Sequence, residues 1–184
     1  MMRFHTNTIY PRLSHQRGFS IVELMIAVVI LAILISVAVP GYTSFIANSQ
    51  IRTTAESITN GISTTRAEAV KRNAQIRFTL NNDTSWQIGC VIVVVGVCPA
   101  IIQAKAAKEG ANGTVSLIIT GANNLIFTSL GTVLNTPGQL GAVEVDSTTI
   151  PATDSKELRV VVNGSSVKMC DPSVIAADDP RRCI

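Results

Sequence analysis

The distribution of apolar and polar residues divides this chain into a leader, a long apolar run, an amphipathic stretch and a region of short runs. Residues 1–18 are mostly polar and basic. Residues 19–39 are almost entirely apolar, and Ser36 is the one polar residue after Leu24 in that run. Helical spacing continues to about residue 73, and short runs typical of strands follow from there.

The apolar run is long enough to cross a membrane. From Phe19 to Val39, a helix that rises ~1.5 Å per residue is about 31 Å long, which matches a hydrocarbon core of roughly 30 Å. Basic residues precede the run and a polar region follows it. This order predicts a membrane-spanning helix over 19–40, with the leader inside and the domain outside.

A second helical segment follows the membrane span. Pro40 and Gly41 predict a kink or a loosening of the helix where it leaves the membrane. Beyond them, apolar and small residues recur at steps of three and four, while charged residues occupy the other faces. The pattern predicts an amphipathic continuation of the helix over 41–73, packed on a domain. Its apolar stripe consists of Ile51, Ala55, Ile58, Ile62, Thr65 and Ala69.

The remaining chain, 74–184, has the pattern of a β-rich globular domain. Gly, Asn and Pro separate short runs of strand-forming residues, and 104–113 is expected to be a mobile loop. The whole chain therefore predicts an α+β fold, in which one long N-terminal helix packs on an antiparallel β-sheet domain. Strands are expected at 75–80, 86–95, 115–120, 125–128, 131–134, 157–162 and 166–170.

Two of these runs allow more specific predictions. The run 91–95 favours a buried strand that leads into a loop closed by Cys90 and Cys98, rather than an exposed edge strand. The pair Asn163-Gly164 stands between two runs and predicts a hairpin turn.

The net charge of +3 belongs to the leader. Arg3, Arg12 and Arg17 lie within the first 18 residues, and removing them leaves 12 basic and 12 acidic residues. A protein that grips nucleic acid over its whole surface is therefore excluded. Both histidines, His5 and His15, also lie in the leader. A processed chain would have no histidine for acid–base catalysis, nucleophile activation or metal binding.

The motifs of common enzyme classes are absent from the sequence. It has no phosphate-binding loop, dinucleotide fingerprint or nucleophile elbow. Asp178 and Asp179 are adjacent, and they are interpreted as turn residues or as partners of Arg181 and Arg182 rather than as a catalytic pair. We therefore expect no enzymatic activity, no cofactor and no metal.

The four cysteines favour two local disulfides. Four cysteines allow three pairings. The separations suit two loops, Cys90–Cys98 and Cys170–Cys183, and neither matches the short knuckle of a zinc site. In an exported domain, disulfides are favoured over metal binding.

The junction between leader and apolar run suggests an unusual processing site. An ordinary signal peptide has small residues after its apolar region, and 37–39 match that pattern poorly. The small residue Gly18 comes before the run, so a cut between Gly18 and Phe19 would keep the anchor on the mature chain. Glu23 would then find a partner in the new α-amine of Phe19 in a neighbouring copy. The alternative is a signal anchor that tolerates an interfacial glutamate.

Residues 17–28, closed by Pro40, resemble the N-terminal signature of type IV pilins and type II secretion pseudopilins, with Arg17 where Lys is more common. The resemblance implies cleavage after Gly18 by a prepilin peptidase, N-methylation of Phe19 and an assembly role for Glu23. It also divides the chain into a leader over 1–18 and a filament-core helix over 19–40.

Two further segments narrow the resemblance. Residues 65–73, followed by a strand, resemble the helix end of the GspH/FimT/FimU group of minor pilins and pseudopilins. The tail, 169–184, resembles that of FimU/FimT-type minor pilins.

The resemblance implies a minor pilin of a Gram-negative type IV pilus, which helps to initiate assembly at the tip and supports twitching motility, adhesion and DNA uptake. It implies other minor pilins, the major pilin, the prepilin peptidase and an inner-membrane assembly platform as partners. The chain would first lie in the inner membrane with its domain in the periplasm, and later in the extracellular pilus. The alternative is a GspH-like minor pseudopilin of type II secretion.

A pilus-tip DNA receptor is a third hypothesis. FimT-type relatives are associated with DNA uptake through a Gly-Arg-x-Arg motif. The matching stretch, 164–168, lacks the first arginine and has Lys168 for the second. Lys168, Arg181 and Arg182 could form a small patch that neutralises about three phosphates.

Overall fold

The computed structural model describes residues 18–107, 109–110, 113–134 and 138–183. The chain separates into two compact units, Met1–Val39 and Pro40–Ile184, and each is described by itself. Helix α1 (Ile21–Arg72) contributes to both units. The leader positions Arg3, Arg12, Arg17, His5 and His15 lie outside the described residues.

Both ends of α1 are capped by local chemistry. Ser20 is the N-cap, because its Oγ accepts a hydrogen bond from the Val22 N–H at 3.3 Å. The helix ends at Arg72, and the next residue, Asn73, has a left-handed φ of 49°. The Asn73 N–H donates to Val70 O and the Ala74 N–H to Ala69 O, each at 3.2 Å, and this pair of bonds forms a Schellman cap.

The helix does not end at the proline. α1 runs through Pro40 and Gly41, where the sequence predicted a kink or a loosening. The boundary between the two compact units falls here along the sequence, between Val39 and Pro40.

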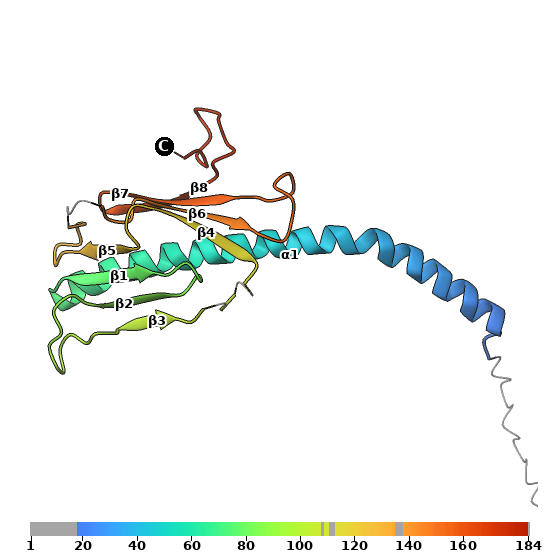
Figure 1. Cartoon of the computed structure of the whole chain (residues 1–184), viewed down its shortest axis with the longest axis horizontal. Helices are drawn as coiled ribbons and strands as arrows, with labels where there is room; N and C mark the ends of the chain where they lie inside the picture. The colour runs from blue at the N-terminus through green and yellow to red at the C-terminus, as the bar shows by residue number, and fades with distance from the viewer. Residues whose placement is uncertain (1–17, 108, 111–112, 135–137, 184) are drawn as a thin grey trace, which may run out of the picture. The chain divides into compact units, whose positions relative to one another are not determined.

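The second unit contains two four-stranded sheets, in which all strand pairs are antiparallel (Figure 1). The first sheet has the order β3-β2-β1-β5 and the second has the order β4-β6-β7-β8. The α+β prediction is confirmed, with two sheets where the sequence predicted one. The strands are β1 (Ile76–Leu80), β2 (Trp86–Cys90), β3 (Gln103–Lys105), β4 (Val115–Thr120), β5 (Asn124–Phe127), β6 (Ala142–Ser147), β7 (Leu158–Asn163) and β8 (Ser166–Cys170).

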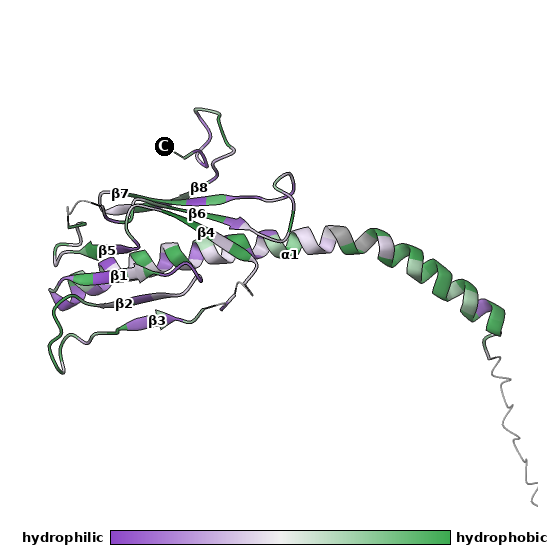
Figure 2. Ribbon diagram, viewed as in Figure 1, coloured by the Kyte–Doolittle hydropathy of each residue, from purple (hydrophilic) through white to green (hydrophobic). Residues whose placement is uncertain are grey.

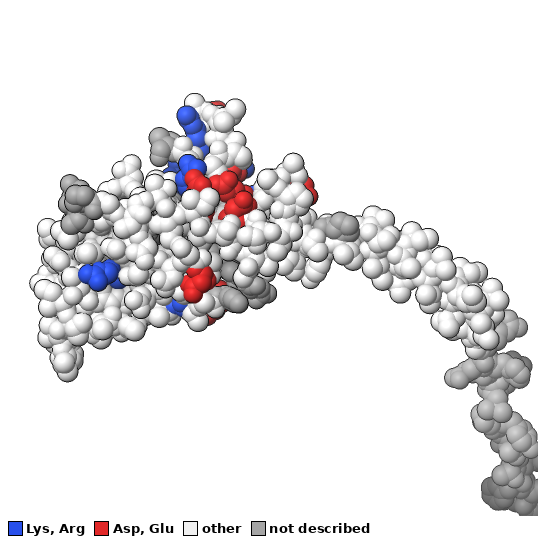
Figure 3. All heavy atoms as spheres, in the orientation of Figure 1, with Lys and Arg blue, Asp and Glu red and all other residues white. Residues whose placement is uncertain are grey.

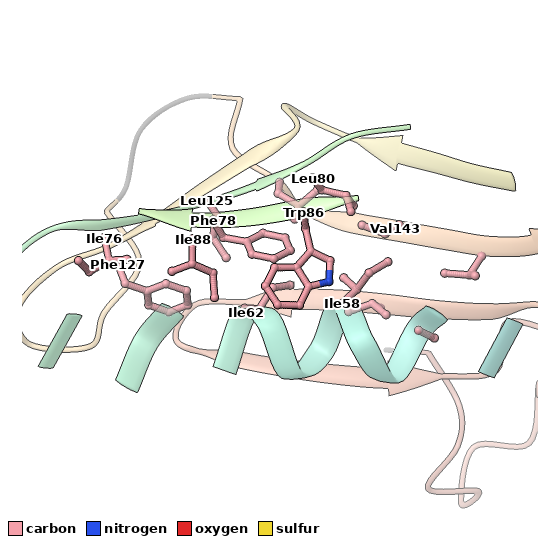
Figure 4. Close-up of a cluster of buried hydrophobic side chains, with 14 of the residues drawn as sticks. Ile58, Ile62, Ile76, Phe78, Leu80, Trp86, Ile88, Leu125, Phe127 and Val143 are labelled. Atoms are coloured by element: carbon pink, nitrogen blue, oxygen red, sulfur yellow. The ribbon is translucent and has the colours of Figure 1, made fainter. Parts of the chain in front are cut away.

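The predicted stripe of α1 forms one side of the core. All six of its residues are at most 1% exposed. Figure 4 shows Phe78, Trp86 and Ile88 pointing from the first sheet toward Ile58 and Ile62 on the helix. The indole N–H of the tryptophan is satisfied, since it donates to Ser57 Oγ at 3.0 Å. The amphipathic helix packed on a domain is therefore confirmed.

Several strand predictions need correction. No strand forms over 131–134, where Val133 makes only an isolated bridge with Phe127. Strand β3 occupies part of the predicted loop 104–113, and residues 108, 111 and 112 of that loop lie outside the described residues. Strand β6 was not predicted, because its outward positions are acidic.

The run 91–95 is the clearest error. Strand β2 ends at Cys90, and residues 91–97 form an exposed loop in place of a buried strand. The chain turns because Val94 and Cys98 exchange both backbone hydrogen bonds, at 2.9 and 2.8 Å.

The predicted hairpin is confirmed as the β7–β8 pair. Its turn lies one residue later than expected, because Asn163 pairs with Ser166 and the turn residues are Gly164 and Ser165. The φ of 57° at Gly164 is the positive value that the first position of a II′ turn requires.

Candidate functional site

The predicted processing site lies immediately before α1. Gly18 and Phe19 are exposed, and no atom lies within 4 Å of the position of a Cβ on Gly18. The Phe19 residue is 85% exposed. The described side of the Gly18–Phe19 bond therefore presents no steric barrier to a protease.

The helix behind this bond is apolar on all sides. Among the described residues, α1 is the helix that is long and apolar enough to cross a membrane, and its most apolar window is 0% buried (Figure 2). Large side chains between Ile21 and Val39 are more than half exposed. A helix that is apolar on every face needs a non-aqueous environment on every face, either lipid or the helices of other subunits.

Glu23 is the one charged residue in this helix segment. It lies in the first turn of α1 and is exposed. Ser20 and Glu23 have the spacing of a capping box, so the carboxylate also favours the positive end of the helix dipole. From residue 18 to 39 the sequence has no Lys, Arg or His. In the uncut chain, a full counter-charge for Glu23 must therefore come from outside this segment.

The four cysteines form the pairs that their spacing favoured. The disulfides are Cys90–Cys98 and Cys170–Cys183, with Cα–Cα distances of 5.7 and 5.1 Å. The described part of the chain has no cluster of three metal-ligating side chains.

The C-terminal tail packs its basic residues in two different ways. Lys168 Nζ donates to the carbonyl oxygen of Arg182 at 3.2 Å, so these two residues are brought together. Arg181 is instead held by Asp179, whose carboxylate accepts bonds from Nε at 3.1 Å and Nη2 at 2.8 Å. The guanidinium and the backbone N–H of Arg181 lower the pKa of Asp179 to about 2. Arg181 is therefore paired with an acidic residue of the same chain.

Acidic residues on β6 and next to the ends of β7 and β8 gather near the start of the tail. Asp146, Glu157 and Asp171 line one groove of about 520 Å³. Burial raises the pKa of Glu157, and the neighbouring carboxylates of Glu144 and Asp146 raise it further. This acidic surface would oppose the binding of a phosphate backbone next to it.

Two family models match the chain. The model described as "Type II transport protein GspH" matches residues 54–166, which is more than half of the chain, and the "Prokaryotic N-terminal methylation motif" matches residues 13–39. This chain belongs to the GspH family of type IV pilin-like proteins. The methylation motif covers Gly18, Phe19 and Glu23.

Curated relatives of this GspH-family chain are fimbrial proteins. A "Fimbrial protein" of Pseudomonas aeruginosa is 32% identical over 108 residues, which cover 57% of this chain and 68% of the relative. The "Type IV major fimbrial protein FimA" of Dichelobacter nodosus is 26% identical over 161 residues, which cover 84% of this chain and 81% of the relative.

Two solved structures are similar to the GspH-family chain. The minor pilin FimU of Pseudomonas aeruginosa aligns with a TM-score of 0.49 and 18% identity, covering 67% of this chain and 90% of FimU. Escherichia coli GspH aligns with a TM-score of 0.44 and 14% identity, covering 68% of this chain and 91% of GspH. Family membership rests on the family models and not on these alignments.

The sequence interpretation missed one exposed feature. Residues 84–104 contain no charged residue, and within them Ile92 is 74% exposed and Val95 is 95% exposed. The sequence signal for this loop was the pair Cys90 and Cys98. A disulfide between cysteines eight residues apart requires the chain to turn back, so a strand cannot continue between them.

Proposed function

We propose that this chain is a minor pilin of a Gram-negative type IV pilus. It is made in the inner membrane with its domain in the periplasm and is cut by a prepilin peptidase between Gly18 and Phe19. It then enters the pilus, where it helps to initiate assembly at the tip. Twitching motility and adhesion would depend on it through the pilus.

The observation that carries this proposal is the exposed apolar helix with one acidic residue near its start. After the cut, the α-amine of Phe19 is the nearest new cation, four residues from Glu23 in sequence. A neighbouring subunit at the same depth supplies this amine to Glu23, and the pair neutralises both charges in a low-dielectric surrounding. The pairing fixes the axial stagger of the subunits, because any other stagger leaves a carboxylate buried without a partner.

In the pseudopilin alternative, the chain would be processed and assembled in the same way, but in a type II secretion system instead of a type IV pilus. The named curated relatives are fimbrial proteins, and the tail around Cys183 resembles that of FimU/FimT-type minor pilins. Both features favour the pilus over type II secretion.

Deleting the gene distinguishes a role in the type IV pilus from a role in type II secretion. We expect loss of twitching motility and fewer surface pili, with normal protein secretion. The matched control restores the full-length gene, and a second strain restores a Gly18→Val variant, which should remain uncut and inactive. Normal twitching together with impaired secretion would instead support the pseudopilin.

DNA binding remains an alternative that can be tested directly. A gel shift of the full-length chain in detergent across a salt series should show little binding, since Arg181 is paired with Asp179 and acidic residues lie nearby. Strong binding at low salt that is lost in Lys168→Gln would support a DNA receptor.

A further inference from the structure

A loop at the end of the second unit where α1 stops has apolar side chains that lie outside the core. We define residues 91–97 as the tip loop. Its large side chains are all aliphatic, and Ile92, Val95 and Val97 are 74%, 95% and 62% exposed. Figure 2 shows this loop as an apolar segment beyond β2. Soluble proteins rarely expose apolar patches larger than a few hundred Å², and such patches mark interaction sites.

The tip loop is held in place from several sides. The Cys90–Cys98 disulfide closes it, and the Val91 N–H donates to the Gln75 carbonyl at 3.0 Å. Arg72 Nη1, at the end of α1, donates to the Val97 carbonyl at 2.8 Å. These bonds hold both ends of the loop in place. Because the loop is already ordered, it loses little conformational entropy when a partner binds.

Other exposed apolar residues lie at the same end of the unit. Leu130 is 82% exposed and Val70 is 54% exposed. Their segments are adjacent, because a Cβ on Gly131 would lie 3.0 Å from Val70 Cγ2. The apolar character of this end therefore does not come from one loop alone.

Basic residues surround this end. Residues 66–77 contain four basic side chains and one acidic side chain, Glu68. Glu68 is already paired with Arg72 at 2.6 Å and with Lys71 at 3.2 Å. In the face shown in Figure 3, one small basic patch lies near β1 at this end, and no Asp or Glu is visible around it. A matching surface would be apolar at its centre and acidic at its rim.

We propose that the tip loop is the apolar centre of an interface with another pilin-like subunit of the same filament, whose contact surface has an acidic rim. This inference rests on the proposed function. This chain itself shows that the fold can carry such acidic residues, since Asp146 and Asp171 lie at the opposite end of the β6–β8 region from the Gly164 turn.

A lipid surface fits the tip loop less well. The loop has no Trp or Tyr, which are the residues that favour the membrane interface. Its irregular backbone would leave N–H and C=O groups without partners in hydrocarbon. A protein surface can supply those partners.

The test places a photo-crosslinking amino acid at position 95 of the full-length chain in its own organism. The control places the same amino acid at Ile175, which is 88% exposed in the C-terminal tail. We expect a crosslink from position 95 to a processed pilin-like subunit, identified by mass spectrometry from its methylated N-terminus. The product should fall at least tenfold when Ile92→Asp is added, and the Ile175 probe should not give it.

Three results would overturn the inference: no product from position 95, the same product from both positions, or a product with lipid. A chain that enters filaments but gives one of these results refutes the interface and leaves the proposed function intact. A wild-type chain that never enters filaments refutes the proposed function itself.

Discussion

Glu23 combines two roles that depend on its position in the chain. At the third position of α1 it favours the helix N-terminus, which contributes about 0.3–1 kcal/mol. As the one charged side chain between Ile21 and Val39, it is also the group for which we propose a counter-charge from a neighbouring subunit. A carboxylate costs ~2.5–3.5 kcal/mol at the centre of a spanning helix and less near its end, where Glu23 lies, and the proposed pairing would offset this cost.

Two substitutions at this position separate the roles. Glu23→Gln keeps a side chain that can complete the capping box but removes the charge, whereas Glu23→Ala removes both. We expect both variants to insert and to be cut normally, and both to enter filaments at least tenfold less than wild type. Immunoblots of sheared pili and of membranes measure this ratio. Normal incorporation of the Gln variant would show that the carboxylate–amine pair is not needed.

Gly61 provides a residue-scale test of the core. A Cβ at this position would lie 2.8 Å from Phe78 Cε2 and 3.3 Å from Trp86 Cε2, so the helix approaches the sheet closely here. We expect Gly61→Ala to lower the free energy of unfolding by roughly 1–3 kcal/mol through overpacking. Gly41→Ala is the matched control, because that helical position has no atom within 4 Å of a Cβ. It should be neutral or stabilising by up to about 1 kcal/mol. Thermal unfolding measures both, and equal effects would contradict the close approach.

The Asp179–Arg181 pair predicts a pH dependence. The pKa of Asp179 is lowered from 3.8 to about 2, so the interaction is complete above pH 4 and is lost as the pH falls through about 2. An NMR titration of the carboxyl carbon should therefore have a midpoint near 2. Arg181→Gln should raise this midpoint toward 3.8, while Arg182→Gln should leave it unchanged. An unchanged midpoint in the Arg181 variant would contradict the pairing.

At the scale of elements, the sequence predicts best where burial and spacing agree. The stripe from Ile51 to Ala69 was predicted at every position, because the helix buries one face along its length. Strands β4 and β8 were also predicted with the right bounds. Strand β6 was missed although Val143 and Val145 alternate with polar residues, because Glu144 and Asp146 favour strands poorly. Glu144 is accommodated by an ion pair with Arg159 on β7.

The tip loop was mispredicted because local composition alone favoured a strand. Five aliphatic residues in a row have the propensity of a buried strand. Residues 91–95 form a loop because Cys98 is disulfide-bonded to Cys90 and because Arg72 donates a hydrogen bond to the Val97 carbonyl. Arg72 and Val97 are 25 residues apart in sequence. A contact over that separation cannot be inferred from local periodicity.

The C-terminal disulfide holds an element that has no strand of its own. Between Cys170 and Cys183, the tail is held to β8 through the Asp171–Arg182 bridge and the Lys168 bond. We expect Cys170→Ser with Cys183→Ser to cost ~2–4 kcal/mol and to increase hydrogen exchange over 171–183. Hydrogen exchange followed by mass spectrometry measures this. The matched control, Cys90→Ser with Cys98→Ser, should increase exchange over 91–97 instead. Two free thiols per wild-type chain would contradict the pairing.

At the scale of the whole molecule, processing at Gly18 would change more than length. The leader holds both histidines and the three arginines that give the chain its net charge. The processed subunit would be neutral overall and free of histidine. The remaining charges would then form two local groups, with basic residues around the tip loop and acidic residues around Asp171. This arrangement favours oriented contacts between subunits. It favours long-range attraction to a uniformly charged polymer less.

The division into two units leads to a final prediction. No described side chain from Ile21 to Val39 is buried, whereas the core consists of residues from Ala47 onward. Removing residues 1–39 should therefore leave the fold unchanged, and a 40–184 fragment should unfold within a few degrees of the full-length chain in detergent. Circular dichroism at rising temperature measures this. The Gly61→Ala substitution should lower both melting temperatures equally, because it acts on the shared core. A fragment that is unfolded, or one that loses the effect of Gly61→Ala, would show that the apolar half of α1 contributes to the domain as well as to assembly.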